Sequence, residues 1–174
     1  MSLFSKRLLE WHKKEGRKDL PWQQNITPYK VWISEIMLQQ TQVSTAIPYF
    51  LKFIQRFPDI DTLANATEDE VLSYWSGLGY YTRARNILKS AQLIKIEFES
   101  TLPKSLKELV TLPGIGRSTA GAIRSIGHGL KAPILDGNVK RVLSRYFKIE
   151  EELSKSSTQK ELWLLAEKVL PKSN

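Results

Sequence analysis

Leu112-Pro113-Gly114-Ile115-Gly116-Arg117 separates two stretches whose apolar residues repeat at helical spacing. Glycine lets a backbone turn tightly and approach a ligand closely, because it has no Cβ. The second stretch begins at about Arg117, so its free N–H groups and the positive end of its dipole should point toward this turn. The pattern predicts a helix–hairpin–helix over about residues 105–126. The alternative is a plain corner that only packs the two helices together and binds no ligand.

The helical period extends over nearly the whole sequence. Thr67 with Glu70, and Thr158 with Glu161, match the capping box that opens a helix. No strand pattern and no solenoid repeat is visible, so the fold class is predicted to be all-α. About nine helices are expected, over approximately residues 3–16, 28–40, 47–57, 67–75, 83–98, 105–111, 117–126, 137–147 and 158–170.

Composition narrows the kinds of partner. The 174 residues include 26 Lys and Arg against 18 Asp and Glu, for a net charge of +8. This surplus favours a polyanionic partner, because Lys and Arg displace the counterions condensed on phosphates. Three of these basic residues, Arg83, Arg85 and Lys89, lie on the long helix predicted over residues 83–98. A basic protein without such a partner would have the same composition.

Other classes of site are disfavoured. The chain has no cysteine, which excludes disulfides, thiolate zinc sites and iron–sulfur ligation within these residues. His12 and His128 lie far apart and lack acidic neighbours at ligand spacing, so no metal site is expected. No apolar run has the length of a membrane span and no secretory signal is visible, which predicts a cytoplasmic protein without a membrane partner.

Glu35 is the only ionisable residue in the apolar stretch of residues 31–38. A carboxyl among apolar side chains prefers to keep its proton, which raises its pKa toward the range useful for a general acid. The alternative is a glutamate at the edge of the helix that reaches water. At helical spacing its face also holds Val31, Trp32, Leu38, Gln39 and Gln42.

Asp136 directly precedes a predicted helix, in the position of an N-cap. It either caps this helix and does nothing more, or it also presents a negative charge to a developing cation. One protonated and one ionised carboxyl are what cleavage of a glycosidic bond through an oxocarbenium-like transition state requires. The sequence alone leaves open whether Glu35 and Asp136 meet.

Six motifs occur along the sequence: Leu20-Pro-Trp22, Thr27-Pro-Tyr-Lys-Val-Trp32, Ser34-Glu-Ile-Met-Leu-Gln-Gln-Thr-Gln42, Gly77-Leu-Gly-Tyr-Tyr81, Leu112-Pro-Gly-Ile-Gly-Arg-Ser-Thr-Ala120 and Ile134-Leu-Asp-Gly-Asn-Val-Lys-Arg141. In sequence and order they closely resemble those of the adenine DNA glycosylases of the MutY family, within the helix–hairpin–helix DNA glycosylase superfamily. The resemblance implies a six-helix barrel domain over about residues 26–129 and a second helical lobe from residues 1–25 and 130–174.

The resemblance implies a base excision repair enzyme that acts on double-stranded DNA. It would extrude adenine that lies opposite guanine or 8-oxoguanine and hydrolyse its N-glycosidic bond. In this family, the residue matching Glu35 protonates the adenine, and the one matching Asp136 stabilises the sugar cation. The residue matching Asn138 lies near the sugar and the catalytic water.

The resemblance also implies the residues that contact the DNA. Those expected in the adenine pocket and at the mismatch are Trp22, Gln23, Gln40, Thr41, Leu78, Tyr80 and Ser118, with Leu78 and Tyr80 as the wedge that fills the base stack. Those expected to bind phosphate are Gly114, Ile115, Gly116, Arg117 and Thr119. Ser118 stands where the related endonuclease III type has a lysine that attacks the sugar, so a monofunctional glycosylase that uses water is predicted.

Members of this family continue beyond the region that matches residue 174, with a four-cysteine [4Fe–4S] loop and a C-terminal domain. We therefore expect a truncated second lobe and no cofactor within this chain. A monomer at the nucleoid of a bacterium is expected. Two alternative functions are a helix–hairpin–helix fragment that binds DNA without catalysis, and an endonuclease III-type glycosylase that also cleaves the strand. A transcriptional helix–turn–helix regulator leaves Glu35 and Asp136 unexplained.

Overall fold

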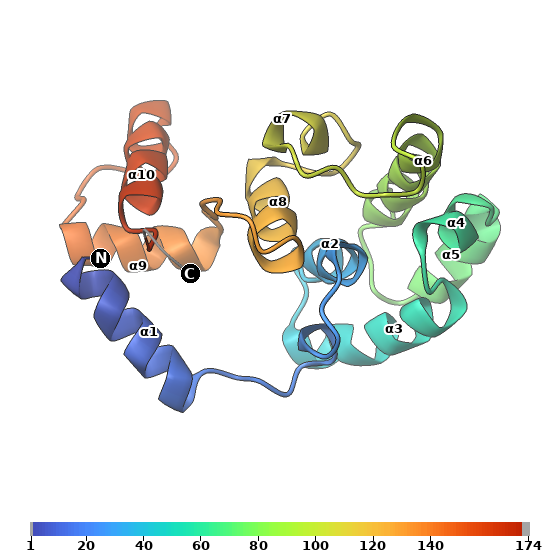
Figure 1. Cartoon of the computed structure of the whole chain (residues 1–174), viewed down its shortest axis with the longest axis horizontal. Coiled ribbons are helices and arrows are strands. Elements are labelled where there is room, and N and C mark those ends of the chain that lie inside the picture. The colour runs from blue at the N-terminus through green and yellow to red at the C-terminus, as the bar shows by residue number, and fades with distance from the viewer. Residues whose placement is uncertain (1, 172–174) are drawn as a thin grey trace. The chain divides into compact units, whose positions relative to one another are not determined.

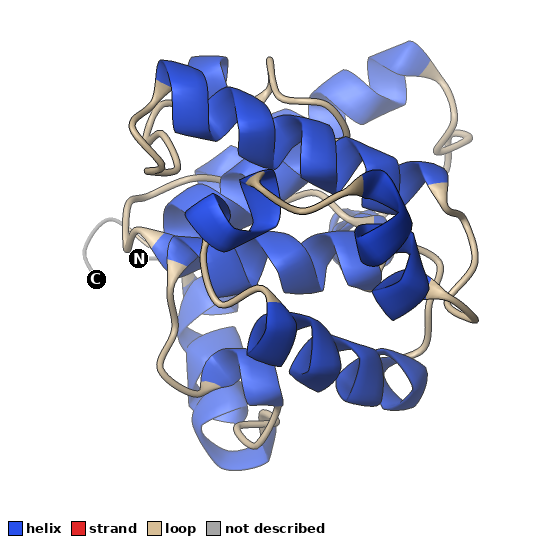
Figure 2. Ribbon diagram, turned by 90° about the vertical axis from the view of Figure 1, so that its right-hand side faces the viewer, coloured by secondary structure: helices blue, strands red, loops and turns tan. Residues whose placement is uncertain are grey.

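The computed structural model describes residues 2–171, and their regular elements are all helical (Figure 1). Figure 2 shows the same: no strand occurs in the described part of the chain, which confirms the all-α prediction. The elements are α1 (Leu3–Glu15), the 3-10 turn η1 (Pro21–Gln23), α2 (Pro28–Met37), α3 (Val43–Arg56), α4 (Ile60–Ala64), α5 (Glu68–Trp75), α6 (Thr82–Glu97), α7 (Leu106–Leu109), α8 (Arg117–Ala122), the π-helical turn η2 (Ile123–Gly127), α9 (Gly137–Phe147) and α10 (Ser156–Lys168).

The chain divides into two compact units. The larger unit is continuous, residues 19–130, and contains η1, α2 to α8 and η2. The smaller unit joins residues 1–18 to residues 131–174, and its described part contains α1, α9 and α10. The larger unit overlaps the barrel domain expected over residues 26–129, and a six-helix barrel within it stays a prediction.

Helix α2 lies at the centre of the larger unit, where it contacts α3, α6, α8, η1 and η2. Seven of its ten residues are buried, and Trp32 is completely so. Helices α3 and α5 pack against each other and contribute fully buried aromatic side chains, among them Phe53 and Trp75, whose rings meet edge-on. Each such side chain contributes roughly 1.5–3 kcal/mol by leaving water. The core of the larger unit therefore fixes α2 and the residues on it.

The smaller unit has a compact core of its own. Leu135, Leu143, Leu162 and Ala166 form its buried cluster, supplied by the segment before α9, by α9 itself and by α10. Phe4 of α1 packs against the same cluster. This contact joins the first helix to the last two, although they are distant in sequence.

Two threonines cap helix starts in the larger unit, and the cap at Thr67 is the predicted one. Thr27 Oγ1 accepts the Lys30 N–H at 3.1 Å in front of α2, and Thr67 Oγ1 accepts the Glu70 N–H at 3.2 Å in front of α5. The capping prediction at Thr158 is wrong. Helix α10 begins earlier, at Ser156, and Thr158 is 2% exposed inside it. Because its side chain is buried in the unit, it serves packing instead of capping.

Two other differences come from short segments. The five-residue helix α4 was not predicted, since five residues are too few to show a helical period. It begins after Asp59, whose Oδ1 accepts the Thr62 N–H at 2.8 Å. Helix α2 ends at Met37 instead of near Gln40, because the chain turns there and Gln40 adopts a left-handed backbone with φ of 56°.

Candidate functional site

Glu35 lies where the buried face of α2 meets solvent. Its neighbours Ser34 and Ile36 are each 2% exposed, whereas Glu35 itself is half-buried. On its own helix face Trp32 is buried and Gln39 is exposed. The sequence left open an embedded carboxyl or one at the helix edge, and the structure combines the two. A carboxyl in this position is held by a mostly buried helix and is still partly exposed to solvent.

Asp136 caps α9 in the smaller unit. Its Oδ1 accepts the Val139 N–H at 2.8 Å, which confirms the predicted N-cap. The residue is exposed, so its other carboxylate oxygen is accessible to a ligand. Asn138 follows in the first turn and is also exposed, and its Oδ1 accepts a hydrogen bond from Arg141 Nη2. This bond orients the carboxamide that the family resemblance assigns to the sugar and water.

The predicted site residues fall into both units. Glu35, all of the predicted adenine-pocket and mismatch residues, and the hairpin belong to the larger unit, and Asp136 and Asn138 belong to the smaller one.

Trp22 and Gln23 form the short turn η1 ahead of α2. The Trp22 ring meets the Phe50 ring edge-on, with centroids 5.4 Å apart. Gln23 Oε1 accepts the Leu20 N–H at 3.2 Å, which closes the turn. Both side chains remain half-buried. Their role as one wall of an adenine pocket stays a prediction.

Gln40 and Thr41 lie in the turn after α2, and Leu78 and Tyr80 lie in the turn after α5. Gln40 is exposed and Thr41 is half-buried. Tyr80 is 60% exposed, but Leu78 is only 7% exposed. Of the two residues expected to form the wedge, only Tyr80 presents its side chain to solvent in this structure.

The hairpin between α7 and α8 contains a type II turn. Pro113 occupies its second position, Gly114 has φ of 79° in the third, and the Ile115 N–H donates to the Leu112 carbonyl at 3.1 Å. Glycine is needed here for two reasons, since a Cβ on Gly114 would also lie 3.0 Å from the Asn86 Cβ of α6. The hairpin is therefore packed closely against α6.

The residues expected to bind phosphate differ in their exposure. Gly114, Gly116 and Arg117 are exposed, and Gly116 is the N-cap of α8. Ile115 and Thr119 are 4% and 8% exposed, so they could offer only backbone atoms. Ser118 is half-buried in the first turn of α8.

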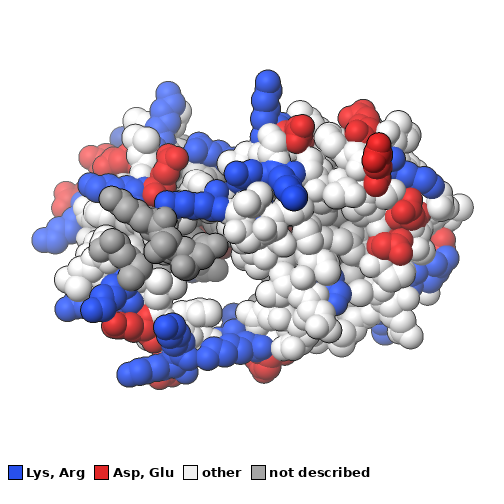
Figure 3. All heavy atoms as spheres, viewed as in Figure 1, with Lys and Arg blue, Asp and Glu red and all other residues white. Residues whose placement is uncertain are grey.

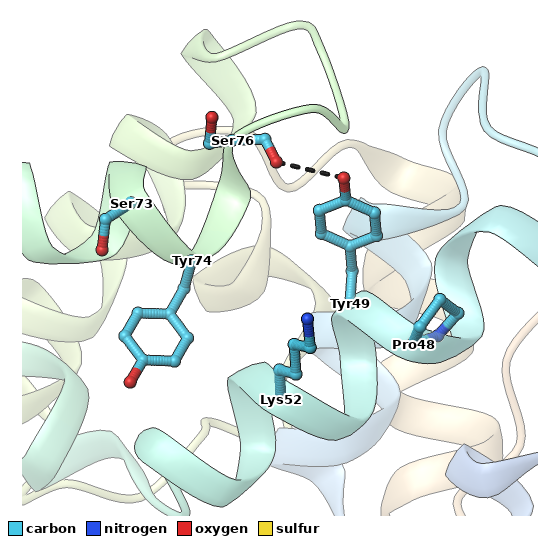
Figure 4. Close-up of a pocket in the computed structure, with 6 residues that line it drawn as sticks. All are labelled: Pro48, Tyr49, Lys52, Ser73, Tyr74 and Ser76. Atoms are coloured by element: carbon cyan, nitrogen blue, oxygen red, sulfur yellow. Dashed lines mark hydrogen bonds between the residues drawn. The ribbon is translucent and has the colours of Figure 1, made fainter.

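A hollow of about 490 Å³ lies between α3 and α5 (Figure 4). Tyr49 lines it and donates from its hydroxyl to the Ser76 carbonyl at 3.0 Å. A Cβ on Gly77, whose φ is 96°, would lie 2.4 Å from this hydroxyl. The contact therefore fixes the start of the turn that carries Leu78 and Tyr80. None of the predicted site residues lines the hollow itself.

Sequence reasoning missed Arg83, which it grouped with the exposed basic residues of α6. Arg83 is 8% exposed, and its guanidinium donates to backbone carbonyls of the segments that carry the predicted site residues. A signal was present in the sequence. Arg83 shares its helical face with Ile87, Ala91 and Ile94, which are all buried.

The two units differ in charge. The larger unit has 11 Lys and Arg against 10 Asp and Glu, and the smaller unit has 15 against 8. Most acidic residues of the larger unit lie in residues 59–70 and 97–99. Figure 3 shows acidic side chains gathered over α4, α5 and the end of α6. The positive charge of the chain is therefore carried almost entirely by the smaller unit.

No metal centre is found in residues 2–171: they contain no group of three or more His, Cys, Asp or Glu that could hold an ion. An iron–sulfur cluster needs cysteine thiolates, and the chain has none. The residues of this chain therefore do not fit an iron–sulfur cluster, which the family resemblance assigns to a four-cysteine loop. None of the described helices combines the length and apolarity needed to cross a membrane.

The sequence matches the family described as HhH-GPD superfamily base excision DNA repair protein over residues 33–168. It is 54% identical over 169 residues to an adenine DNA glycosylase of Buchnera aphidicola subsp. Baizongia pistaciae, covering 97% of this chain and 48% of the relative. The corresponding protein of Buchnera aphidicola subsp. Acyrthosiphon pisum is 55% identical over 172 residues, covering 99% of this chain and 49% of the relative. The chain thus spans about half the length of these relatives.

Among solved structures, a thermostable thymine-DNA glycosylase superimposes with a TM-score of 0.87 at 27% identity. The match covers 97% of this chain and 77% of that one. The arrangement of helices is therefore that of a DNA glycosylase, as the sequence predicted.

Proposed function

Because the chain belongs to the HhH-GPD superfamily of base excision DNA repair proteins, we propose that it removes adenine from double-stranded DNA by hydrolysing the bond between base and sugar. The observation that carries the proposal is the position of Glu35, the only carboxylate on α2, at the solvent edge of an otherwise buried helix. The choice of adenine is supported by the names of the relatives.

In the proposed reaction Glu35 acts as a general acid. Its protonated carboxyl donates to a ring nitrogen of the extruded adenine. The bond between C1′ and N9 then breaks, and adenine leaves neutral with both electrons of that bond. Water adds to C1′ and gives a proton back to Glu35. The products are free adenine and an abasic sugar.

Asp136 stabilises the cation that forms on the sugar as the base leaves. This role is supported by its cap geometry, since the Val139 N–H holds one carboxylate oxygen and fixes the orientation of the group. The other oxygen can face the cation. Asn138, oriented by Arg141, would position the sugar and the attacking water.

The proposed substrate is a duplex in which adenine lies opposite guanine or 8-oxoguanine. Backbone N–H groups of Gly116 and Arg117 would bind a phosphate, where the dipole of α8 also favours an anion. Tyr80 would enter the base stack beside the mispair, and Gln40 would approach it through the minor groove. We place this reaction in a monomeric enzyme in the cytoplasm of a bacterium, at its nucleoid.

The test is a single-turnover measurement of adenine release from a duplex with one A:8-oxoguanine pair. Glu35→Gln should slow release by about 100- to 10,000-fold, because it removes the general acid, while the Kd for the duplex changes little. Release from Glu35→Gln at the wild-type rate would contradict the proposal. Binding without release in both proteins would favour the DNA-binding fragment.

Asp136 can be tested separately from its role as a cap. Asparagine is as good an N-cap as aspartate, so Asp136→Asn should retain stability and lose activity. Asp136→Ala should lose activity and also about 1 kcal/mol of stability. Equal activity of wild type and Asp136→Asn would show that Asp136 serves only as the N-cap of α9.

The test for strand cleavage is borohydride trapping of a covalent adduct between protein and DNA. With Ser118 in the first turn of α8 and water as the nucleophile, no covalent DNA adduct should be trapped. A trapped adduct would favour the endonuclease III type of chemistry.

A further inference from the structure

The guanidinium of Arg83 is buried in the larger unit and surrounded by uncharged groups. Arg83 is 8% exposed, and no carboxylate in residues 2–171 forms an ion pair with it. Its Nη1 and Nη2 atoms lie 2.6–3.3 Å from six acceptor oxygens: the carbonyls of Ile36, Met37, Gln39, Leu78 and Gly79 and the hydroxyl of Thr41.

These acceptors belong to the three segments that carry predicted site residues. Ile36 and Met37 end the helix that holds Glu35. Gln39 and Thr41 flank Gln40, and Leu78 and Gly79 precede Tyr80. One side chain thus ties together the end of α2, the turn after it and the turn after α5.

The chemistry of the site suits arginine and no other residue type. The last carbonyls of a helix lack a partner within the helix, and the negative end of its dipole favours a cation. A guanidinium offers five donors in a planar fork, which lysine cannot reproduce. The Trp75 and Tyr80 rings lie 5.3 and 5.4 Å from the Arg83 Cζ. Burial lowers the pKa of Arg83, and the nearby Tyr80 opposes this shift. The Nε atom of Arg83 is buried without a hydrogen-bond partner among residues 2–171, so the hydrogen bonds to the three segments all come from Nη1 and Nη2.

The two turns need such support from outside. Gln40 has φ of 56° and Tyr80 has φ of 50°, a left-handed backbone that residues other than glycine rarely adopt. Such conformations persist only where surrounding contacts hold them. Arg83 bonds to the residues on both sides of Gln40 and to the two residues before Tyr80.

We propose that Arg83 is a positioning residue that holds Glu35 and the two turns predicted to contact DNA, those of Gln40 and Tyr80, in one fixed geometry. The inference rests on the proposed function. Arg83 touches neither base nor phosphate, because it is buried. It acts through the backbone of its three segments, and its loss should impair adenine release more than DNA binding.

The matched control is Arg85, two residues along the same helix. Arg85 is exposed and pairs with Glu68 at 2.8 Å, so Arg85→Gln removes an arginine from α6 without touching the three segments. Arg83→Gln keeps two donors without the charge, and Arg83→Lys keeps the charge without the fork.

The first measurement is amide hydrogen exchange on the full chain without DNA. In Arg83→Gln, exchange should become faster by about tenfold or more in residues 36–41 and 77–80 together, and stay unchanged in α9. Arg83→Lys should show a smaller change and Arg85→Gln none. Unchanged exchange in either segment of Arg83→Gln would overturn the proposal. This readout does not depend on activity.

The second measurement is single-turnover release of adenine, with the rate constant separated from the burst amplitude. Arg83→Gln should lower the rate constant by about 10- to 100-fold with a Kd close to wild type. A merely structural role would lower only the burst amplitude, and that result would overturn the proposal. If wild type itself releases no adenine, the proposed function fails, while hydrogen exchange still decides the role of Arg83.

Discussion

The larger and smaller units achieve order in different ways. The larger unit encloses aromatic side chains completely, including Trp32, Phe53 and Trp75. The smaller unit has a buried cluster of four residues and leaves large apolar side chains exposed, among them Trp11, Tyr146 and Leu164 at 52–67%. In the smaller unit, two side chains of the same type can therefore differ widely in their contribution to stability, even on one helix.

The net charge is concentrated in the smaller unit, whereas the extensive aromatic core lies in the larger one. The larger unit is almost neutral at +1, and the smaller unit carries +7. The comparison indicates a division of labour within the proposed function. In that proposal the larger unit would supply the geometry for recognition and for the acid, and the smaller unit would supply long-range attraction for a polyanion together with Asp136.

The strongest challenge to this comparison is a set of core substitutions. Phe53→Ala in the larger unit should destabilise by about 3–5 kcal/mol, because Phe53 is fully buried against Phe57 and Trp75. In the smaller unit, Leu162→Ala should cost about 2–5 kcal/mol and Leu164→Ala less than about 0.5 kcal/mol. These two lie on the same helix but are 0% and 67% exposed.

Urea unfolding, followed by hydrogen exchange of peptides from each unit, measures these losses. Similar losses for Leu162→Ala and Leu164→Ala would show that exposure in this structure does not report energetic weight in the smaller unit.

Removing positive charges is expected to have a smaller effect. Neutralising three exposed lysines of α1 should weaken duplex binding by about tenfold and reduce the slope of log K against log salt by about 1–3. The reason is that phosphates should gather on the positive unit. Replacing three exposed lysines of the larger unit by glutamine should change the slope by less than about 1. The two sets are Lys6, Lys13 and Lys14, and Lys52, Lys89 and Lys104, all exposed.

Fluorescence anisotropy at several salt concentrations provides the slopes. If both triple variants change the slope equally, the electrostatic half of the comparison is wrong.

The smallest effect concerns acid sensitivity of the larger unit. Burial, followed by the nearby charge of Lys104, lowers the pKa of His128, whose Nε2 is buried without a hydrogen-bond partner. Between the folded-state pKa and about 6.5, the unfolded chain therefore binds more protons than the folded one. The free energy of unfolding should fall as the pH drops through this window and should be independent of His128 above it.

His128→Asn should flatten this part of the pH profile. The measurement is the free energy of unfolding of both proteins at pH 7.5 and at pH 5.5. Parallel decreases in the two proteins would assign the acid sensitivity to other groups.

Local patterns predicted much of the fold and part of the site. Helix α9 has the predicted bounds, Gly137–Phe147, and Asp136 caps it as expected. Both features are set within a dozen residues by an acceptor side chain and a helical period. Helix α6 also agrees with its prediction to within a residue at each end.

What the sequence did not predict depends on distant backbone. The acceptors of Arg83 on α2 and the turn after it lie 42–47 residues away, and five of its six acceptors are carbonyls, which every residue carries. No side-chain pattern reveals such partners. The contrast between buried Leu78 and exposed Tyr80 has the same origin, because the packing around the turn decides which side chain faces out.

The neutral surroundings of Arg83 have a consequence for working conditions. Carbonyl oxygens and aromatic faces do not titrate near neutral pH, and a buried charge–dipole contact is screened far less by electrolyte than an exposed pair such as Arg85–Glu68. The junction of α2 with its two turns should therefore keep its shape in buffers where attraction to a polyanion has already faded. Affinity and internal geometry then respond to different variables, and a change in ionic strength can separate them in one protein without any substitution.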